Sequence, residues 1–296
     1  MDIEQQEEAL RYFREYALDW KRKAEITSKD EVNVILQRNN YVIQVIQGRK
    51  NTERVLDIGC GTGDLVCEIA QKGIEVTGID FSENMIRIAR DKAKNLRGKT
   101  ARFECSSIFN YALEPENYDV ISANGFIEYI SYEELETLLD ISLEALRREG
   151  SLILGSRNRL FNIFSLNIFT EEEISDNTLT ALTAEAIQMA KVRDISDLFG
   201  QITAPVQEKG KKHQETGIQV SSRYQYTPVQ LVHLFRKKGF QPVEIFPIHI
   251  HGVNPEFKEK YPSIHGIISN LLQNYAPHNM SLVPQASSFM IHAIKG

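Results

Sequence analysis

The sequence predicts an α/β protein built on a doubly wound, mostly parallel sheet, with N-terminal helices and an inserted cap. From Glu53 onward short apolar runs alternate with helical patterns, which is typical of a parallel sheet covered on both faces. A glycine-rich stretch follows the first of these runs, and two further apolar runs near the C-terminus bring the expected sheet to seven strands. At 296 residues the chain is long enough for a large core and a ligand pocket.

Residues 1–48 are expected to form helices that precede the sheet. Apolar residues recur at helical spacing from residue 4 to residue 24, which predicts one amphipathic helix. A second helix is expected from about Lys29 to Gln47. These helices either fold over a ligand or pack against the sheet.

Residues 49–156 are expected to hold the first five strands and the helices between them. The predicted strands are 54–58, 75–80, 100–105, 118–123 and 151–156. The predicted helices are 64–72, a helix capped by Ser82 that runs to about Leu96, and 132–148. This region therefore forms one doubly wound unit.

Residues 157–225 interrupt the alternation with a long irregular stretch, which is typical of a substrate cap or lid. The pattern returns in residues 226–296, which are expected to rejoin the sheet. There a helix begins after Thr227 and ends at Gly239, and the last strands are predicted at 242–249 and 287–294.

Charge and composition exclude several classes of protein. The 34 Lys and Arg against 40 Asp and Glu give a net charge of −6, which disfavours a nucleic-acid partner. No apolar run is long enough to span a membrane, and the acidic N-terminus does not resemble a signal peptide. The three cysteines lack a Cys-x-x-Cys spacing and are expected to be reduced and buried. We therefore expect a cytoplasmic protein, and leave both a monomer and a homo-oligomer open.

The glycine-rich stretch indicates a nucleoside-containing ligand. The strand Val-Leu-Asp-Ile, residues 55–58, runs into Gly59, Gly61 and Gly63, where the backbone can turn tightly and approach a ligand. A dinucleotide site would need Gly-x-Gly-x-x-Gly and a pyrophosphate, which Asp57 would repel. S-adenosylmethionine (SAM) instead carries a positively charged amine and sulfonium, and a second carboxylate, Asp80, is suitably placed to bind ribose hydroxyls.

These residues resemble the motif of the class I SAM-dependent methyltransferases, in the small-molecule group that includes ubiquinone-biosynthesis and sugar-modifying enzymes. The resemblance is strong over residues 50–156 and weak over 226–296. It implies a Rossmann-like fold and SAM as the cofactor. Carried over to this chain, the family pattern implies that the methionine end of SAM contacts Asp57, Gly59 and Gly61, with Gly63 completing the loop, and that the ribose and adenine contact Asp80, Phe81 and Met85.

The same resemblance places two later segments beside the cofactor. Where the family commonly has an Asp near the adenine amine, this chain has Ser107 followed by Ile108, so the charge of that contact is lost. Asn124 is expected near the sulfonium. The chain lacks the Asn/Asp-Pro-Pro-Tyr segment of enzymes that methylate nucleobase amines, which further disfavours a nucleic-acid substrate.

Candidate catalytic bases follow the late strands. His249 and His251 lie on the same side of an extended segment, and neutral histidine is suited to accept a hydroxyl proton, with His251 preferred. Rival candidates are His213, Glu128 and Tyr129, whereas His292 is expected to be structural. No metal site is expected, because no third ligand stands out near the two histidines.

The acceptor is expected to be a small molecule, a sugar or a lipid or polysaccharide precursor, methylated on a hydroxyl. Methylation of a nitrogen or carbon atom and a non-catalytic SAM-binding role are the alternatives. Several polar residues near the expected active face could bind an acidic acceptor, and three aromatic residues of the first helix could close over SAM. The polar residues are Arg157, Asn158, Arg159 and Arg223, and the aromatic ones are Tyr12, Tyr16 and Trp20.

Overall fold

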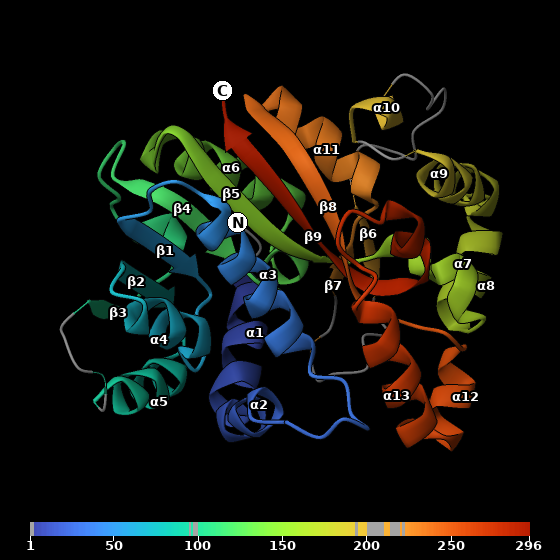
Figure 1. Ribbon diagram of the computed structural model, residues 1–296, viewed down its shortest axis with the longest axis horizontal. Helices are drawn as coiled ribbons and strands as arrows, with labels where there is room; N and C mark the ends of the chain where they lie inside the picture. The colour runs from blue at the N-terminus through green and yellow to red at the C-terminus, as the bar shows by residue number, and fades with distance from the viewer. Residues whose placement is uncertain are drawn as a thin grey trace.

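A computed structural model describes residues 3–94, 96, 100–192, 195–199, 210–213, 220 and 223–296. Its centre is a sheet of seven strands in the order β3-β2-β1-β4-β5-β9-β8 (Figure 1). The predicted fold class, a doubly wound and mostly parallel sheet, is confirmed. Within the described residues no helix combines the length and the apolar character that a membrane span requires.

The first five strands are parallel, whereas β9 runs antiparallel to both of its neighbours, β5 and β8. β9 thus lies between two strands that precede it in the chain. The strands are β1 (Arg54–Ile58), β2 (Glu75–Asp80), β3 (Ala101–Cys105), β4 (Tyr118–Ala123), β5 (Leu146–Arg157), β8 (Phe240–Ile250) and β9 (Ala286–Lys295).

Helices cover both faces of the sheet and create two apolar cores. Alternate residues of β1 point to opposite faces, so Val55 packs in one core and Leu56 in the other. The Val55 face is covered by α3 (Val34–Gly48), α4 (Asp64–Gln71) and α5 (Glu83–Ala93), and the Leu56 face by α6 (Tyr132–Ala145) and α11 (Pro228–Lys237). This arrangement leaves the carboxyl ends of the parallel strands free for a site.

The N-terminal segment forms two helices, so the prediction of one helix over residues 4–24 is wrong. α1 (Ile3–Glu15) and α2 (Ala17–Ala24) are separated at Tyr16, which has non-helical φ and ψ of −98° and 17°. The ring of Tyr16 stacks on that of Tyr12, with centroids 4.9 Å apart.

The next helix, α3, begins at Val34 and not at the predicted Lys29. Asn33 is its N-cap, since the Oδ1 atom accepts a hydrogen bond of 2.9 Å from the Leu36 N–H. The Asn33 amide also donates to the carbonyls of Ala24 and Ile26, so the preceding loop is fixed in a non-helical path.

The boundary between α6 and β5 also differs from its prediction. The helix ends at Ala145, and β5 begins at Leu146 and not at Ser151. The backbone leaves the helix at Leu146, which has extended φ and ψ of −74° and 138° and pairs with Tyr118 of β4, and the register of this pairing then shifts before Ser151.

Residues 157–225 contain short helices and one small two-stranded ladder, and part of this expected cap lies outside the described residues. The elements are η3 (Arg159–Phe161), α7 (Asn162–Ser165), α8 (Ile168–Ser175), α9 (Leu179–Lys191), α10 (Ile195–Phe199), β6 (Lys211–His213) and β7 (Arg223–Gln225). Arg159 and Glu173 form a buried bidentate ion pair of 2.8–2.9 Å that ties η3 to α8.

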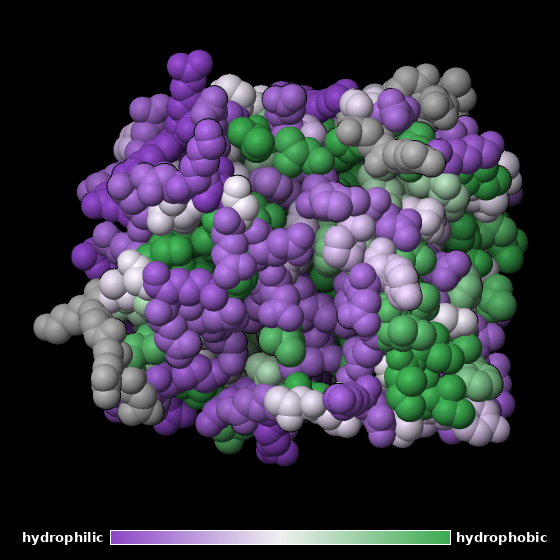
Figure 2. Space-filling view, in the orientation of Figure 1, coloured by the Kyte–Doolittle hydropathy of each residue, from purple (hydrophilic) through white to green (hydrophobic). Residues whose placement is uncertain are grey.

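The segment between β8 and β9 contains α12 (Pro255–Lys260), α13 (Pro262–Gln273) and η4 (Met280–Gln285). Figure 2 shows apolar side chains gathered over α13, where Ile264, Ile267 and Leu271 are exposed. Among the cysteines, all of which are free, Cys60 and Cys67 are buried as predicted, but Cys105 is exposed. Cys105 closes β3 beside the sheet edge, where no further strand covers it.

Candidate functional site

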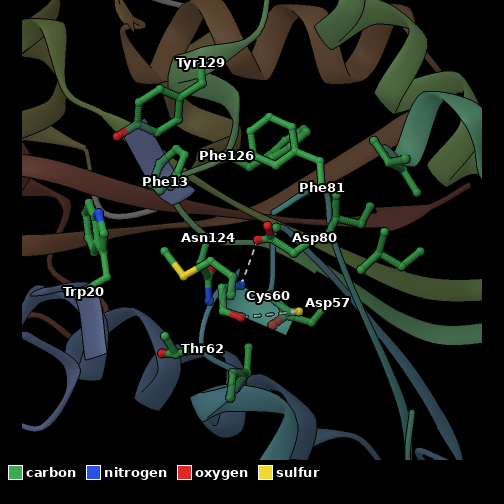
Figure 3. Close-up of a pocket in the computed structure, with 18 of the residues that line it drawn as sticks. Phe13, Trp20, Asp57, Cys60, Thr62, Asp80, Phe81, Asn124, Phe126 and Tyr129 are labelled. Atoms are coloured by element: carbon green, nitrogen blue, oxygen red, sulfur yellow. Dashed lines mark hydrogen bonds between the residues drawn. The ribbon is translucent and has the colours of Figure 1, made fainter. Parts of the chain in front are cut away.

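A pocket opens at the carboxyl ends of β1, β2 and β4 and is covered by α1, α2 and α3 (Figure 3). Its volume is about 1300 Å³ with the open solvent at its mouth included. The lining contains every expected cofactor residue except Gly63: Asp57, Gly59, Gly61, Asp80, Phe81, Met85, Ser107, Ile108 and Asn124. The strand-end position expected for a ligand is therefore occupied by this pocket.

The loop between β1 and α4 brings backbone against the pocket. Gly59, Gly61 and Gly63 have positive φ values of 68°, 51° and 75°. Only Gly59 and Gly61 line the pocket. Gly63 begins α4, and a Cβ there would lie 2.7 Å from that of Ala89. Gly63 therefore serves the packing of α4 on α5, although it belongs to the same motif.

Asp57 lies at the end of β1 and is buried. Its Oδ1 atom accepts a hydrogen bond of 2.6 Å from the Ser122 hydroxyl on β4. The pKa of Asp57 is raised to about 7, chiefly by burial and to a smaller extent by the nearby Asp80, while the Ser122 hydrogen bond opposes the shift. A cationic group placed here would restore the charged form of the carboxylate.

Asp80, at the end of β2, is held by two backbone groups. Its two oxygen atoms accept hydrogen bonds from the N–H groups of Gly61, at 3.0 Å, and Ser82, at 2.8 Å. Burial raises its pKa to about 6 against these hydrogen bonds. Each oxygen retains a second lone pair for a ligand hydroxyl.

The side of the pocket beyond Asp80 is apolar. Phe81 follows β2, Met85 lies in the first turn of α5, and Ile108 lies in the short helix η1 (Ile108–Asn110). Ser107 caps η1 by accepting a hydrogen bond from the Phe109 N–H, at 3.4 Å. These side chains form a largely apolar slot that is suited to a flat nucleobase.

The end of β4 lies under the other half of the pocket. The Asn124 amide donates to Asn39 Oδ1, at 3.3 Å, and its own Oδ1 atom is buried without a partner among the described residues. An acceptor atom is thus available beside Asp57. Next to it, Gly125 is in contact with the guanidinium of Arg38, which occupies the space that a Cβ would need.

Aromatic rings enclose the mouth of the pocket. Phe13 lies edge-on to Tyr129, with centroids 5.1 Å apart, and 6.3 Å from Phe81. Figure 3 shows Phe13, Phe126 and Tyr129 grouped on one side and Trp20 beside them. α1 and α2 therefore form one wall of the pocket.

Three arginines lie behind this aromatic mouth. Arg38 donates to Ser288 Oγ, at 2.7 Å, and Arg223 is paired with Glu128, at 3.1 Å. Arg157 has a buried Nη1 atom with no hydrogen-bond partner in the described part of the chain, and burial together with Arg223 lowers its pKa to about 10. The carboxylate of Glu128 is paired with Arg223 and acts electrostatically on both Arg38 and Arg157.

The two histidines expected as bases do not line the pocket. His249 and His251 do lie on the same side of the strand end, with rings 4.2 Å apart, but both are buried. His213 is buried against Glu172, at 2.7 Å, and His292 donates to or accepts from Ser151 within the sheet. Among the candidate bases, the pocket lining of the described residues includes Glu128 and Tyr129.

Two features of the site were not found in the sequence. Arg38 and Phe13 line the pocket from the N-terminal helices, where no local motif distinguishes them from ordinary helix residues. A third histidine, His265 on α13, joins His249 and His251, so the premise that no third ligand lies near them is wrong. The signal was weak because the three residues are separated by a loop and a helix.

Comparisons with known proteins agree with this geometry. Residues 55–150 match the family model described as a methyltransferase domain. The chain is 28% identical over 183 residues to the ubiquinone biosynthesis O-methyltransferase of Leptothrix cholodnii, covering 61% of this chain and 73% of that protein. It is also 28% identical over 123 residues to the enzyme of the same name from Idiomarina loihiensis, covering 41% and 49%. The chain thus spans about half the length of several curated relatives that it matches.

The fold extends beyond the matched domain. The structure of magnesium protoporphyrin IX methyltransferase from Synechocystis PCC 6803 with bound S-adenosylhomocysteine superposes with a TM-score of 0.58. The two share 16% identity and the superposition covers 97% of this chain and 98% of that one, so the likeness is one of fold.

Residues 55–150 of this chain match a methyltransferase domain, and the strand order of the sheet, the strand-end pocket and the glycine loop give this domain the fold of SAM-dependent methyltransferases of known structure.

Proposed function

We propose that this protein transfers the methyl group of SAM to a hydroxyl group of a small-molecule acceptor that also carries an anionic group. The observation that supports this most is that one pocket is lined both by the SAM loop at Asp57 and Gly61 and by Arg38, Glu128 and Tyr129. Arg157, which does not itself line the pocket, interacts electrostatically with these last three groups. Donor and acceptor can therefore meet in one enclosed space.

The donor end matches the charge distribution of SAM. Asp57 and the free Oδ1 atom of Asn124 are acceptors for the ammonium group, and Asp80 is an acceptor for ribose hydroxyls. The apolar slot between Phe81 and Ile108 is suited to adenine. Bound in this way, SAM would present its methyl group to the part of the pocket lined by Phe13, Phe126 and Tyr129.

The acceptor end is suited to a negatively charged group. Arg38, Arg157 and Arg223 lie around Glu128, and the Nη1 atom of Arg157 is buried without a hydrogen-bond partner among the described residues, which is costly. A carboxylate or phosphate on the acceptor would pair with Arg157 and relieve this cost. The rings of Phe13, Phe126 and Tyr129 favour a flat apolar body on the same molecule.

Methylation of a hydroxyl group requires either a base that removes its proton or surroundings that stabilise the resulting anion. We keep His251 and His249 as proposed bases, which would require the acceptor site to extend beyond the described pocket. Glu128 lines the pocket itself and lies beside Arg223 and Tyr129, so it is the alternative base. An acceptor nitrogen or carbon would need no strong base, and a non-catalytic SAM-binding role would need none at all.

The proposal also covers the domain organisation of the chain, its location in the cell and its partners. We propose that residues 157–225 act as the substrate cap, since they supply Arg157 and Arg223 to the acceptor end. We also propose a cytoplasmic protein with no nucleic-acid partner, in line with its net charge of −6. Both a monomer and a homo-oligomer remain compatible with this function.

SAM binding can be followed through Trp20, the single tryptophan of the chain, which lines the pocket. We expect SAM to change its fluorescence, and Phe13→Ala to weaken binding because the ring 5.9 Å from Trp20 is lost. Leu18→Ala, on the exposed face of α2, serves as the control and should bind SAM as the unmodified protein does. If SAM neither alters the fluorescence nor raises the melting temperature, the proposal fails at its first step.

The acceptor class is tested by release of S-adenosylhomocysteine from a panel of aromatic hydroxyl compounds with and without a carboxylate. Arg157→Met should raise KM for the anionic acceptors by about 10–100-fold, the loss of one hydrogen-bonded charge pair, and leave neutral acceptors unchanged. Arg148→Met changes an exposed arginine of the same strand and should have no effect. Equal losses for anionic and neutral acceptors would contradict an anion site.

A further inference from the structure

Three buried histidines meet where β8 ends against α13, outside the pocket described above. His249, His251 and His265 are 8%, 2% and 3% exposed. Their ring centroids are 4.2–5.2 Å apart, and one ring nitrogen from each lies within 4.8 Å of those of the others. Within the described residues this is the one group of three or more His, Cys, Asp or Glu side chains with such spacing.

The backbone conformation at His249 and at Gly266 brings the end of β8 close to α13. His249 has a φ of 55°, a left-handed conformation that is strained for any residue other than glycine, and its N–H donates to Gln37 Oε1 at 2.9 Å. Gly266, next to His265, allows α13 to touch the carbonyl of Asp30, a contact that a Cβ would prevent. The helix is thereby held close enough to bring His265 to the strand end.

Several ring nitrogens of the three histidines lack hydrogen-bond partners among the described residues. His249 Nε2 and His265 Nε2 lie 3.0 Å apart, and His249 Nδ1 lies 3.0 Å from Ser287 Oγ. Neither ring nitrogen of His251 has a well-formed hydrogen bond among the described residues, although the backbone of Val253 is near enough to interact with it. A buried imidazole without partners is unfavourable unless something else binds it.

We infer that His249, His251 and His265 bind a divalent transition metal ion, with zinc as the best fit. Two nitrogens on one tetrahedral zinc lie about 3.3 Å apart, since each Zn–N bond is about 2.0–2.1 Å, and the 3.0 Å between the Nε2 atoms of His249 and His265 is close to this. Three neutral imidazoles without a carboxylate select zinc, cobalt, nickel or copper over magnesium and calcium.

Two neighbouring side chains support the proposed metal site. Ser287 holds the second nitrogen of His249, as outer partners of metal-bound histidines do. Phe161 packs on His251 at 4.5 Å and limits access of water on that side. Three protein ligands leave a fourth position on the ion for water or another small ligand.

Lys258 on α12 opposes metal binding. Its ammonium group lies close enough to interact electrostatically with all three histidines, and the guanidinium of Arg38 interacts in the same way with His249. Their positive charges must also repel a divalent ion. Removing the Lys258 charge should therefore tighten metal binding, whereas a purely hydrogen-bonded histidine cluster would show no metal binding to tighten.

The test uses the full chain, stripped with a chelator and dialysed against zinc or cobalt. We expect about one equivalent of tightly held zinc by elemental analysis, a tetrahedral absorption spectrum with cobalt and a rise in melting temperature with zinc. His265→Gln should weaken binding by roughly 100-fold or more and Ser287→Ala by about tenfold, because outer partners typically account for 10–100-fold in metal affinity. Lys258→Gln should strengthen it several-fold.

His278→Gln is the control, since His278 is exposed on the surface and outside the cluster. It should leave the stoichiometry unchanged. Absence of a stoichiometric metal in the unmodified, folded protein overturns the inference, and so does zinc binding that survives His265→Gln and Ser287→Ala unaltered. The readouts do not involve methyl transfer, so failure of the inference leaves the proposed methyl transfer untouched. If the inference holds, His249 and His251 are occupied by the metal and Glu128 is the proposed base.

Discussion

At the scale of single residues, burial determines the chemistry of the SAM end. Asp57 and Asp80 both end parallel strands, and both have raised pKa values because the sheet removes them from water. Each is kept close to its charged form by hydrogen bonds, from Ser122 in one case and from backbone N–H groups in the other. Asp57, with a pKa of about 7, is therefore partly protonated at neutral pH, and a cationic ligand would favour its charged form.

This predicts a pH dependence of SAM affinity. Below a pKa of about 7, Asp57 is protonated and must lose its proton before it can pair with the ammonium of SAM. Affinity should therefore rise with pH from about 5.5 to about 7, by up to about tenfold per pH unit. Asp57→Asn should bind SAM more weakly and with a flatter profile, measured by calorimetric titration at several pH values.

A matched control is Asp91→Asn, which changes an exposed carboxylate of α5 that is paired with Lys94. It should keep the steep profile of the unmodified protein. If Asp57→Asn is as steep as the unmodified protein, the titrating group is another one, and Asp57 does not contact the ammonium.

At the scale of elements, boundaries are determined by contacts as much as by local sequence. Ser82 and Thr227 cap their helices as predicted, since each accepts a hydrogen bond from a backbone N–H within the next three residues. The start of α3 at Val34 follows instead from the side-chain hydrogen bonds of Asn33, and the break at Tyr16 has no such explanation in the contacts of its side chain. Such contacts leave no periodic signal.

The start of α4 offers a test of this view. Gly63 and Gly73 both have positive φ, but a Cβ at Gly63 would meet Ala89 and Phe103, whereas one at Gly73 would meet nothing within 4 Å. We expect Gly63→Ala to cost about 2–5 kcal/mol of unfolding free energy, from backbone strain and overpacking together. Gly73→Ala should cost only the strain, about 1–2 kcal/mol. Urea unfolding measures both, and equal costs would show that packing against α5 contributes nothing.

At the scale of the whole molecule, the sheet joins distant parts of the chain. β9 lies between β5 and β8, and its partner residues on β5 precede it by more than a hundred positions. The two cores on either side of the sheet both include residues from β9. The matched methyltransferase domain, residues 55–150, is thus only part of one continuous fold.

We therefore expect that a chain ending at Tyr226 does not fold cooperatively. It would lack β8, β9 and α11, so the buried face and edge of β5 would be exposed to water. Soluble yield and thermal melting by circular dichroism measure this, and adding residues 227–296 as a separate chain should partly restore both. A cooperative melt of the shortened chain at the original temperature would contradict the expectation.

Prediction from sequence succeeded where the residues that line the pocket lie within one short segment of the chain. The loop from Asp57 to Gly61 and the strand end at Asp80 could be assigned because glycine spacing and strand pattern are local, and they line the pocket. Gly63 shows the limit of this reasoning, since it shares the motif but packs against α5. Arg38 and His265 could not be assigned, because nothing within their own helices marks them.

The sequence by itself indicated the fold class and the methyl donor. Both depend on patterns of neighbouring residues, namely the alternation of strands with helices and the glycine-rich loop. Only the tertiary structure decided what surrounds the donor. The arginine cluster combines α3, β5 and β7, and the histidine cluster combines β8 and α13. Their chemistry arises from burial and from distances between segments that are far apart in the chain, which no local pattern encodes.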